Sequence, residues 1–400
     1  MTKERVKYEF ARRLAGMGAS AIREILKVTE RPDVISFAGG LPAPEVFPVE
    51  ELARAHAEVF AEEGAQACQY STTEGFGPLR EWIAGRMRAR GVARADAARV
   101  LVTSGSQQGI DLVGKIFLEP GDPVVVENPC YLAALQVFRG YEAELVAVGS
   151  DDEGMRVEEV ERAVAGAPRR PKLIYVVSQF HNPKGTTLSP ARRRALLDVA
   201  RRFGVPIVED DPYGELRYRG APVSPLAASD DDGLVIYLST FSKTLSPGMR
   251  VGWAHASEEV FGALVRAKQA ADLHTNTIQQ RAAARLLASF DFDAHVERIK
   301  TVYGERLDAM LAALAEHFPV GARWTRPEGG LFLWVELPEG LSAEELFDRA
   351  IAERVAFVPG APFFAADARR NFMRLNFSNS KPEAIEEGVR RLGGLLRSAA

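Results

Sequence analysis

The sequence predicts an α/β fold: a large domain with a mostly parallel seven-stranded sheet flanked by helices, followed by a smaller α+β domain. Three observations support this prediction. Short, almost wholly apolar runs recur along the chain as far as Ala254, as expected for strands that are buried on both faces. Amphipathic stretches such as Gln107–Leu118 and Pro190–Phe203 separate several of these runs, which is typical of parallel strands connected by helices. The last quarter of the chain has a different pattern.

Seven apolar runs are the candidate strands of the large sheet. They are Arg99–Thr103, Pro123–Glu127, Glu144–Val148, Leu173–Ser178, Pro206–Glu209, Leu234–Ser239 and Arg250–Ala254. We expect this sheet and its helices to occupy residues 41–285.

The smaller domain is predicted from the pattern that follows. A long helical region begins near Thr277 and ends at His317. Later segments with strand or helix character are Gly329–Val335, Val355–Val358, Phe372–Phe377 and the final helix Pro382–Leu396. We therefore expect a small α+β domain over residues 286–400.

Composition and charge exclude several classes of protein. The 400 residues are 46% hydrophobic and 26% charged, which is ordinary for a globular chain and excludes disordered, collagenous and coiled-coil proteins. A formal charge of −4 gives no overall attraction to nucleic acid or anionic membranes. Two cysteines, Cys68 and Cys130, form neither a disulfide framework nor a CxxC zinc pair, and we expect no metal site. The charged start lacks a signal peptide's apolar core, and no apolar run reaches the ~20 residues of a membrane span. We expect a soluble cytoplasmic protein.

The strongest local pattern surrounds Lys243. This lysine follows a buried apolar strand, is flanked by the hydroxyl residues Thr240 and Ser242, and precedes Arg250. A partly desolvated lysine has a lowered pKa and becomes a nucleophilic amine suited to a Schiff base. The hydroxyls and the arginine suit a phosphate. A lysine and an arginine on a solvated loop would give the same pattern.

A second pattern is the segment Ser104–Gly109, which lies between a strand and a helical run and includes Ser106 and Gln107. Small residues let the backbone approach a ligand, and a helix N-terminus presents free N–H groups to an anion. The segment matches neither the GxxxxGK[ST] loop nor the GxGxxG turn, so ATP and dinucleotides lose support. An ordinary strand-to-helix turn with a serine cap fits equally well.

Polar residues also stand at the ends of other strands. The acidic segment Glu209–Tyr213 lies where open α/β sheets bind ligands, although a solvated acidic turn would look the same. The segment Phe180–Gly185 is typical of an Asn-Pro turn, in which we expect His181 to have a structural role rather than to act as a base. Arg374, inside the apolar run Met373–Phe377, needs a partner: a substrate carboxylate held by both arms of the guanidinium, or an internal Asp or Glu.

The order and spacing of these motifs resemble the fold type I, pyridoxal-phosphate-dependent class I aminotransferases. The resemblance extends over nearly the whole chain, including Phe37–Pro42 and Tyr70–Gly75, and is greatest to the 2-aminoadipate and kynurenine aminotransferase branch. The matching residues are Ser106, Gln107, Tyr131, Asn182, Pro183, Asp210, Tyr213, Ser242, Lys243, Arg250 and Arg374. The resemblance implies pyridoxal 5′-phosphate as cofactor, a homodimer with its active site at the interface, and an N-terminal arm over residues 1–40 that packs with the small domain.

The resemblance also implies roles around the cofactor ring. Lys243 would hold the cofactor covalently and shuttle the α-proton of the substrate. Asp210 would keep the pyridinium nitrogen protonated so that the ring can accept electrons. Asn182 and Tyr213 would hydrogen-bond the ring hydroxyl oxygen, and Tyr131 would stack on the ring face.

The phosphate and the substrate have their own implied partners. The residues expected at the phosphate are Ser106, Gln107, Thr240, Ser242, Arg250 and Tyr70, the last from the neighbouring chain. Tyr70 could instead be a buried core tyrosine within its own chain. Arg374, with Asn182 and the backbone of Gly40, would bind the α-carboxylate of the substrate. One departure from the family is Lys184, where the Asn-Pro-x-Gly turn usually has threonine, and we expect it to alter the surface near the site.

We expect the protein to transfer an amino group from an α-amino acid to a 2-oxo acid in two stages. The expected donors are 2-aminoadipate, glutamate, aromatic or branched-chain amino acids, and the expected acceptor is 2-oxoglutarate. Arg23 lies where the aminoadipate enzymes place an arginine that meets a distal carboxylate, but a surface arginine paired with Glu24 or Glu30 fits as well. Lyases and decarboxylases share the fold, and some ligand-sensing regulators carry this domain without activity. The presence of Lys243 and Asp210 argues against a sensor.

Overall fold

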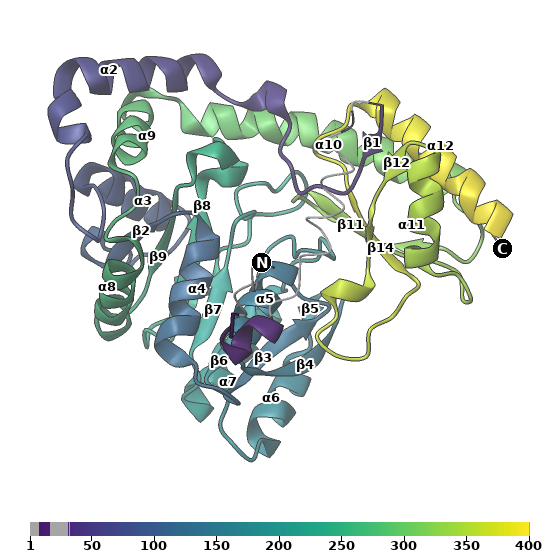
Figure 1. Ribbon diagram of the computed structural model, residues 1–400, viewed down its shortest axis with the longest axis horizontal. Helices are drawn as coiled ribbons and strands as arrows, with labels where there is room; N and C mark the ends of the chain where they lie inside the picture. The colour runs from purple at the N-terminus through teal and green to yellow at the C-terminus, as the bar shows by residue number, and fades with distance from the viewer. Residues whose placement is uncertain (1–7, 17–30, 32, 400) are drawn as a thin grey trace, which may run out of the picture.

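The computed structural model describes residues 8–16, 31 and 33–399, and these form two bodies of secondary structure that stand side by side (Figure 1). One contains an eight-stranded sheet, and the other contains a four-stranded sheet. The α/β fold with a large, mostly parallel sheet and a smaller sheet domain is therefore confirmed.

The large sheet contains all seven predicted strands and one more. Its order is β2 (Val100–Thr103), β9 (Gly252–His255), β8 (Val235–Thr240), β7 (Ile207–Asp210), β6 (Leu173–Val176), β3 (Pro123–Asn128), β4 (Glu144–Asp151) and β5 (Gly154–Met155). The central strands β8, β7, β6, β3 and β4 are parallel, whereas β9 is antiparallel to both of its neighbours and β5 is antiparallel to β4. The predicted number of seven strands was wrong because it omitted β5, and a strand of two residues is too short to show any periodicity.

Helices cover both faces of the large sheet. The covering helices are α3 (Gly77–Ala89), α4 (Ser106–Phe117), α5 (Leu132–Gly140), α6 (Val157–Gly166), α7 (Pro190–Phe203), α8 (Glu258–Asp272) and α9 (Thr277–Ser289), and α2 (Val49–Ala67) packs on the outer side of α9 (Figure 1). Alternate residues of one strand enter different cores: Val124 and Val126 pack with α4, α5 and α8, while Val125 packs with α3, α6 and α7. Burial on both faces explains why the strands are apolar throughout rather than alternating.

The helix α7 shows how local sequence sets an element's limits. The hydroxyl of Ser189 accepts a hydrogen bond from the backbone N–H of Arg192, and Pro190 occupies the first turn. The helix ends at Gly204, which adopts a left-handed backbone with φ of +63°. These signals predict the same bounds that the structure has.

The small sheet is antiparallel and packs against long helices. Its order is β10 (Arg323–Trp324), β11 (Phe332–Glu336), β14 (Phe372–Asn376) and β13 (Val358–Pro359), and its helices are α10 (Phe292–His317), α11 (Ala343–Ala352) and α12 (Pro382–Ala399). The single helical region expected from Thr277 to His317 is two helices, because the side chain of Asp291 accepts a hydrogen bond from the N–H of Ala294 and starts α10 anew. The run Val355–Val358 likewise divides into β12 (Val355–Ala356) and β13, which have different partners.

The described part of the N-terminal segment contacts both bodies. A short 3₁₀ helix, η1 (Arg12–Gly16), lies against α5, and Arg12 forms an ion pair with Glu142 at 2.7 Å. Further along, β1 (Ile35–Ser36) pairs in parallel with β12 of the small body. Only this later part lies beside the small domain; the boundaries at residues 40 and 285 stay a prediction. No helix in the described ranges is long and apolar enough to cross a membrane.

Candidate active site

A cavity of about 300 Å³ opens at the carboxyl ends of the parallel strands, where α/β sheets bind ligands. Twelve residues proposed from the sequence line it: Gly40, Ser106, Gln107, Tyr131, Asn182, Asp210, Tyr213, Thr240, Ser242, Lys243, Arg250 and Arg374. Tyr70 does not line the cavity, and Arg23 lies outside the described residues. Tyr70 is 78% exposed and contacts the edge of His274, so the alternative of a buried core tyrosine is wrong.

The end of β8 places Lys243 in the cavity. Thr240 ends the strand, and its hydroxyl accepts a hydrogen bond from the backbone N–H of Ser242 at 3.1 Å, which begins a tight 3₁₀ turn. The Nζ atom of Lys243 donates to the carbonyl oxygen of Gly40 at 2.7 Å. Burial, aided by the positive charges of Arg374 and Arg250, lowers the pKa of Lys243 to about 8. Near neutral pH, a larger fraction of this amine is therefore neutral and nucleophilic than of an ordinary lysine.

Two adjacent aspartates at the end of β7 have different surroundings. Asp211 accepts hydrogen bonds from Arg90 at 2.8 Å and from the hydroxyl of Tyr237 at 3.0 Å. Asp210 faces the cavity, where the hydroxyl of Tyr175 donates to its Oδ2 at 2.8 Å. Its Oδ1 is buried and has no hydrogen-bond partner in the described parts of the chain. Burial raises the pKa of Asp210 to about 7. Both carboxylates are buried, so the solvated acidic turn is excluded.

The N-terminus of α4 and Arg250 form one wall of the cavity. The Nη2 of Arg250 donates to the carbonyl oxygen of Ser104 at 3.0 Å. Gly105 has a left-handed φ of +81°, and a Cβ there would lie 2.5 Å from Arg250 Nη2, so only glycine fits. The side chain of Gln108 accepts from the N–H of Ser104 at 2.8 Å and from the buried Lys268 at 2.8 Å. The N-terminus of α4, with Ser106 and Gln107, and the guanidinium of Arg250 thus line the same cavity, which suits an anion.

Arg374 reaches the opposite wall from β14. Its Nη1 donates to Oδ1 of Asn182 at 2.9 Å and its Nη2 to the carbonyl oxygen of Ala38 at 2.6 Å. The guanidinium lies over the ring of Phe332, 4.3 Å from its centroid. Burial lowers the pKa of Arg374 to about 10. An internal carboxylate was the alternative partner, but no described Asp or Glu forms an ion pair with Arg374.

Sequence reasoning missed several residues of the cavity. They are Leu132, Ala133, Gln136, Val177, Pro212, Pro247 and Phe332. Leu132, Ala133 and Gln136 share one face of α5, and their spacing would have shown this had Tyr131 been recognised as the residue preceding the helix. Tyr175 was also missed, because a tyrosine inside an apolar run is typical of any strand.

The Asn-Pro turn has a buried interior. His181 is 1% exposed, and burial lowers its pKa to about 3, in keeping with a structural role. The expectation that Lys184 alters the surface was wrong, since its Nζ points inward and donates to Ser150 Oγ at 2.9 Å and to the carbonyl oxygen of Asp151 at 2.8 Å. These contacts come from β4, which is distant in sequence.

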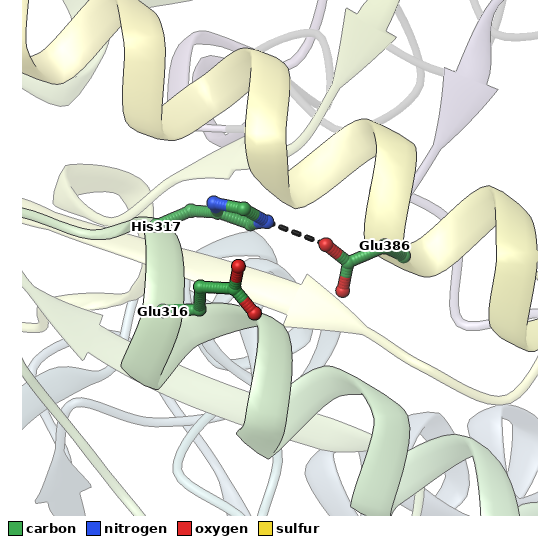
Figure 2. A group of neighbouring side chains, drawn as sticks. All are labelled: Glu316, His317 and Glu386. Atoms are coloured by element: carbon green, nitrogen blue, oxygen red, sulfur yellow. Dashed lines mark hydrogen bonds and ion pairs between the residues drawn. The ribbon is translucent and has the colours of Figure 1, made fainter.

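One group of described side chains could hold a metal ion, and it lies away from the cavity. Figure 2 shows Glu316 and His317 at the end of α10 beside Glu386 of α12. His317 and Glu386 form a hydrogen bond. A contact that joins the packed helices α10 and α12 accounts for this arrangement.

Comparison with known proteins identifies the family. The family model described as "Aminotransferase class I and II" matches residues 32–392. Aromatic-amino-acid aminotransferase 1 of Thermococcus litoralis is 47% identical over 97% of this chain and 94% of its own.

Two solved structures superpose closely. The α-aminoadipate aminotransferase of Thermus thermophilus, complexed with N-(5′-phosphopyridoxyl)-L-leucine, has a TM-score of 0.91 at 43% identity over 98% of this chain and 97% of its own. The kynurenine aminotransferase of Pyrococcus horikoshii, in complex with PMP, has a TM-score of 0.92 at 43% identity over 97% of each chain. The resemblance seen in the motifs is confirmed: this chain belongs to the class I and II aminotransferases and is a fold type I enzyme.

Proposed function

We propose that the cavity binds pyridoxal 5′-phosphate and that the enzyme uses it to move an amino group from an α-amino acid to a 2-oxo acid. The observation that supports this most strongly is the pairing of Asp210 and Lys243 in one cavity. An acidic oxygen that has no partner among the described residues and a nucleophilic amine of lowered pKa face the same space. Two similar enzymes hold a pyridoxyl group, as N-(5′-phosphopyridoxyl)-L-leucine and as PMP.

The chain's residues fit each part of this cofactor. The N-terminus of α4 with Ser106 and Gln107, together with Arg250 and Ser242, would hold the phosphate, and Thr240 supports that turn. Asp210 Oδ1 fits the protonated ring nitrogen. Asn182 and Tyr213 would orient the ring hydroxyl oxygen, with Tyr131 over the ring face.

Each residue then has a task in the reaction. When bound, pyridoxal phosphate supplies an electron sink for the negative charge that develops at the substrate's Cα. The Nζ of Lys243 anchors the cofactor and then carries the α-proton. Arg374, which Asn182 and the backbone carbonyl of Ala38 hold in place, binds the α-carboxylate of every donor, and the backbone at Gly40 closes over it.

The described lining favours donors with apolar side chains. Leu132, Ala133 and Phe332 offer an apolar wall, and the described cations of the cavity, Lys243, Arg250 and Arg374, already have assigned tasks. A donor with a distal carboxylate, such as 2-aminoadipate or glutamate, needs a further cation, and we propose Arg23 for that position. We propose 2-oxoglutarate as acceptor.

We further propose a homodimer in which Tyr70 completes the phosphate site of the neighbouring chain. Its exposed phenol supports this, because a phenol donates a hydrogen bond without adding charge. Cys68 and Cys130 are free thiols, which suits the reducing cytoplasm we expect for the enzyme.

The test is covalent trapping combined with turnover. Borohydride reduction of the yellow holoenzyme should label the peptide containing Lys243, and Lys243→Ala should abolish keto acid formation from a panel of donors with 2-oxoglutarate. Lys115→Arg is the matched control, because that lysine is exposed on α4 and does not line the cavity, so labelling of the Lys243 peptide and turnover should both be unchanged. Labelling at Lys268 or Lys184 would overturn the anchor, and release of product without a stoichiometric acceptor would indicate a lyase or decarboxylase.

A further inference from the structure

We infer that Tyr175 is a positioning residue of this enzyme: its hydroxyl holds one oxygen of Asp210 so that the other is aimed into the cavity at the ring nitrogen of the cofactor. The inference rests on the proposed function, since it gives Asp210 the ring nitrogen as its partner. Tyr175 itself does not line the cavity and acts only through Asp210.

The sheet places the two groups together. Tyr175 lies on β6 and Asp210 on the adjacent parallel strand β7, where Tyr175 is level with Val208. Asp210 is therefore two residues further toward the carboxyl end, and its side chain lies on the same face of the sheet. The long phenol spans this offset and donates to Oδ2 at 2.8 Å. No flexible segment takes part, so the contact is set by strand register.

The surroundings of Tyr175 hold its ring still. The side chain is 1% exposed and belongs to the core beneath α4 and α5. The ring of Phe138, from α5, meets it edge to face with centroids 5.6 Å apart. A donor held by the core in this way fixes the carboxylate in turn. Oδ2 is the oxygen that receives the bond, and Oδ1 is the one left without a described partner.

A neutral donor is the type of group that this position needs. A carboxylate buried without any donor tends to become protonated, and a protonated Asp210 would lose its attraction for a pyridinium nitrogen. An arginine or lysine in place of Tyr175 would keep Asp210 ionised but would compete with the ring nitrogen for its charge. The phenol stabilises the ionised form and adds no charge, as its lowering effect on the pKa of Asp210 reflects.

Asp211 provides the internal contrast. It also accepts from a buried tyrosine, Tyr237 on β8, but Arg90 neutralises it, and it does not line the cavity. The other titratable groups that act on Asp210 or are acted on by it are Asp211, Cys130, Tyr131 and Tyr213. Tyr237→Phe is therefore a matched control. It removes a buried hydroxyl that donates to Asp211, just as Tyr175→Phe removes a buried hydroxyl that donates to Asp210.

The experiment compares Tyr175→Phe with Tyr237→Phe in the full chain. The readouts are the equilibrium affinity of the apoenzyme for pyridoxal 5′-phosphate, the pH titration of the absorbance of the bound cofactor, and kcat and KM with one donor. Loss of a hydrogen bond to a charged group weakens binding or slows a reaction by a factor of roughly ten to one hundred. We expect Tyr175→Phe to lower kcat by that factor with little change in KM, and to weaken cofactor binding. The acid limb of the absorbance titration, which reports protonation of Asp210, should move to higher pH. Tyr237→Phe should change none of these.

The outcomes separate the inference from the proposed function. If the wild-type protein fails to bind pyridoxal 5′-phosphate, the proposed function is wrong. If the wild type binds it normally and Tyr175→Phe matches Tyr237→Phe in all three readouts, the positioning role is wrong. In an Asp210→Asn background, Tyr175→Phe should cost almost nothing further in cofactor affinity, and a full additional loss there would also overturn the role.

A second variant covers the case in which Tyr175→Phe does not fold. Replacing Tyr175 by 3-fluorotyrosine keeps the ring and the hydroxyl and makes the phenol a stronger donor. The acid limb of the absorbance titration should then move to lower pH, opposite to the shift expected for phenylalanine. No shift in a folded protein with bound cofactor would contradict the inference.

Discussion

The substitution Arg374→Lys keeps a positive charge in the cavity but removes the planar fork that the structure uses. The guanidinium already donates to Asn182 Oδ1 and to the carbonyl oxygen of Ala38, and it lies 4.3 Å from the ring centroid of Phe332 and 5.1 Å from that of Phe363. A lysine ammonium has a shorter reach and no plane, so it cannot keep these contacts and also bind both oxygens of a carboxylate. Loss of one hydrogen bond to a charged group costs about 1.5–3 kcal/mol, which is roughly a 10- to 150-fold decrease in kcat/KM.

The assay measures kcat/KM for three donors with unlike side chains, such as leucine, phenylalanine and glutamate. All of them should lose the same factor, because all share the α-carboxylate. Arg193→Lys is the control: Arg193 is 5% exposed, donates to the backbone carbonyl oxygens of Leu188, Ser178 and Ser224, forms an ion pair with Glu209 at 3.6 Å, and does not line the cavity. It should lower the melting temperature and leave kcat/KM unchanged. A loss confined to glutamate would refute the reasoning, since Arg374 would then bind the side chain.

Four further outcomes are expected. The rate at which the apoenzyme captures pyridoxal 5′-phosphate should rise with pH and level off above about 8, because only the neutral amine of Lys243 reacts; stopped-flow absorbance measures it, and a flat profile would contradict the lowered pKa. Gly105→Ala should weaken cofactor affinity at least tenfold in a titration, since its Cβ meets Arg250 and its φ is left-handed, whereas Gly77→Ala, which meets nothing, should not. Lys268→Met should weaken cofactor affinity severalfold by releasing the side chain that holds the N–H of Ser104, and unchanged affinity would remove Lys268 from the phosphate wall. Mixing inactive Lys243→Ala chains with Tyr70→Ala chains should raise activity above either parent, and no rise in confirmed hybrids would contradict a shared site.

Much of the fold could be predicted from local sequence. An apolar run such as Val100–Thr103 shows a fully buried strand, and Ser189 with Gly204 shows both ends of α7. What failed had no local signal: β5 is two residues long, and the separation of β12 from β13 depends on partners supplied by β1 and β14.

The residues of the site likewise fall into those that local sequence could predict and those that it could not. Lys243 and Ser106 stand in patterns whose chemistry is visible in the chain, so their residue types could be interpreted from the sequence alone. Contacts between distant segments could not, and three examples show it: Arg374 with Ala38, Lys184 with Ser150, and Tyr175 with Asp210. Each depends on which segments become neighbours in the folded chain. A tyrosine or lysine gives no hint of its partner when that partner lies tens of residues away and on another strand.

The charges of the cavity explain why these groups work together. Lys243, Arg250 and Arg374 bring up to three positive charges into a space lined by one acidic side chain, Asp210. The two arginines help to lower the pKa of Lys243, so the empty cavity gives this amine a larger neutral, reactive fraction than an ordinary lysine has. A phosphate beside Arg250 and a carboxylate beside Arg374 would offset those charges, and the amine could then hold a proton more readily. Under the proposed function, the same lysine would first attack a carbonyl and later receive the α-proton of a bound amino acid. We propose that neutralisation of the two arginines by the ligand's two anionic ends assists the change between these two tasks.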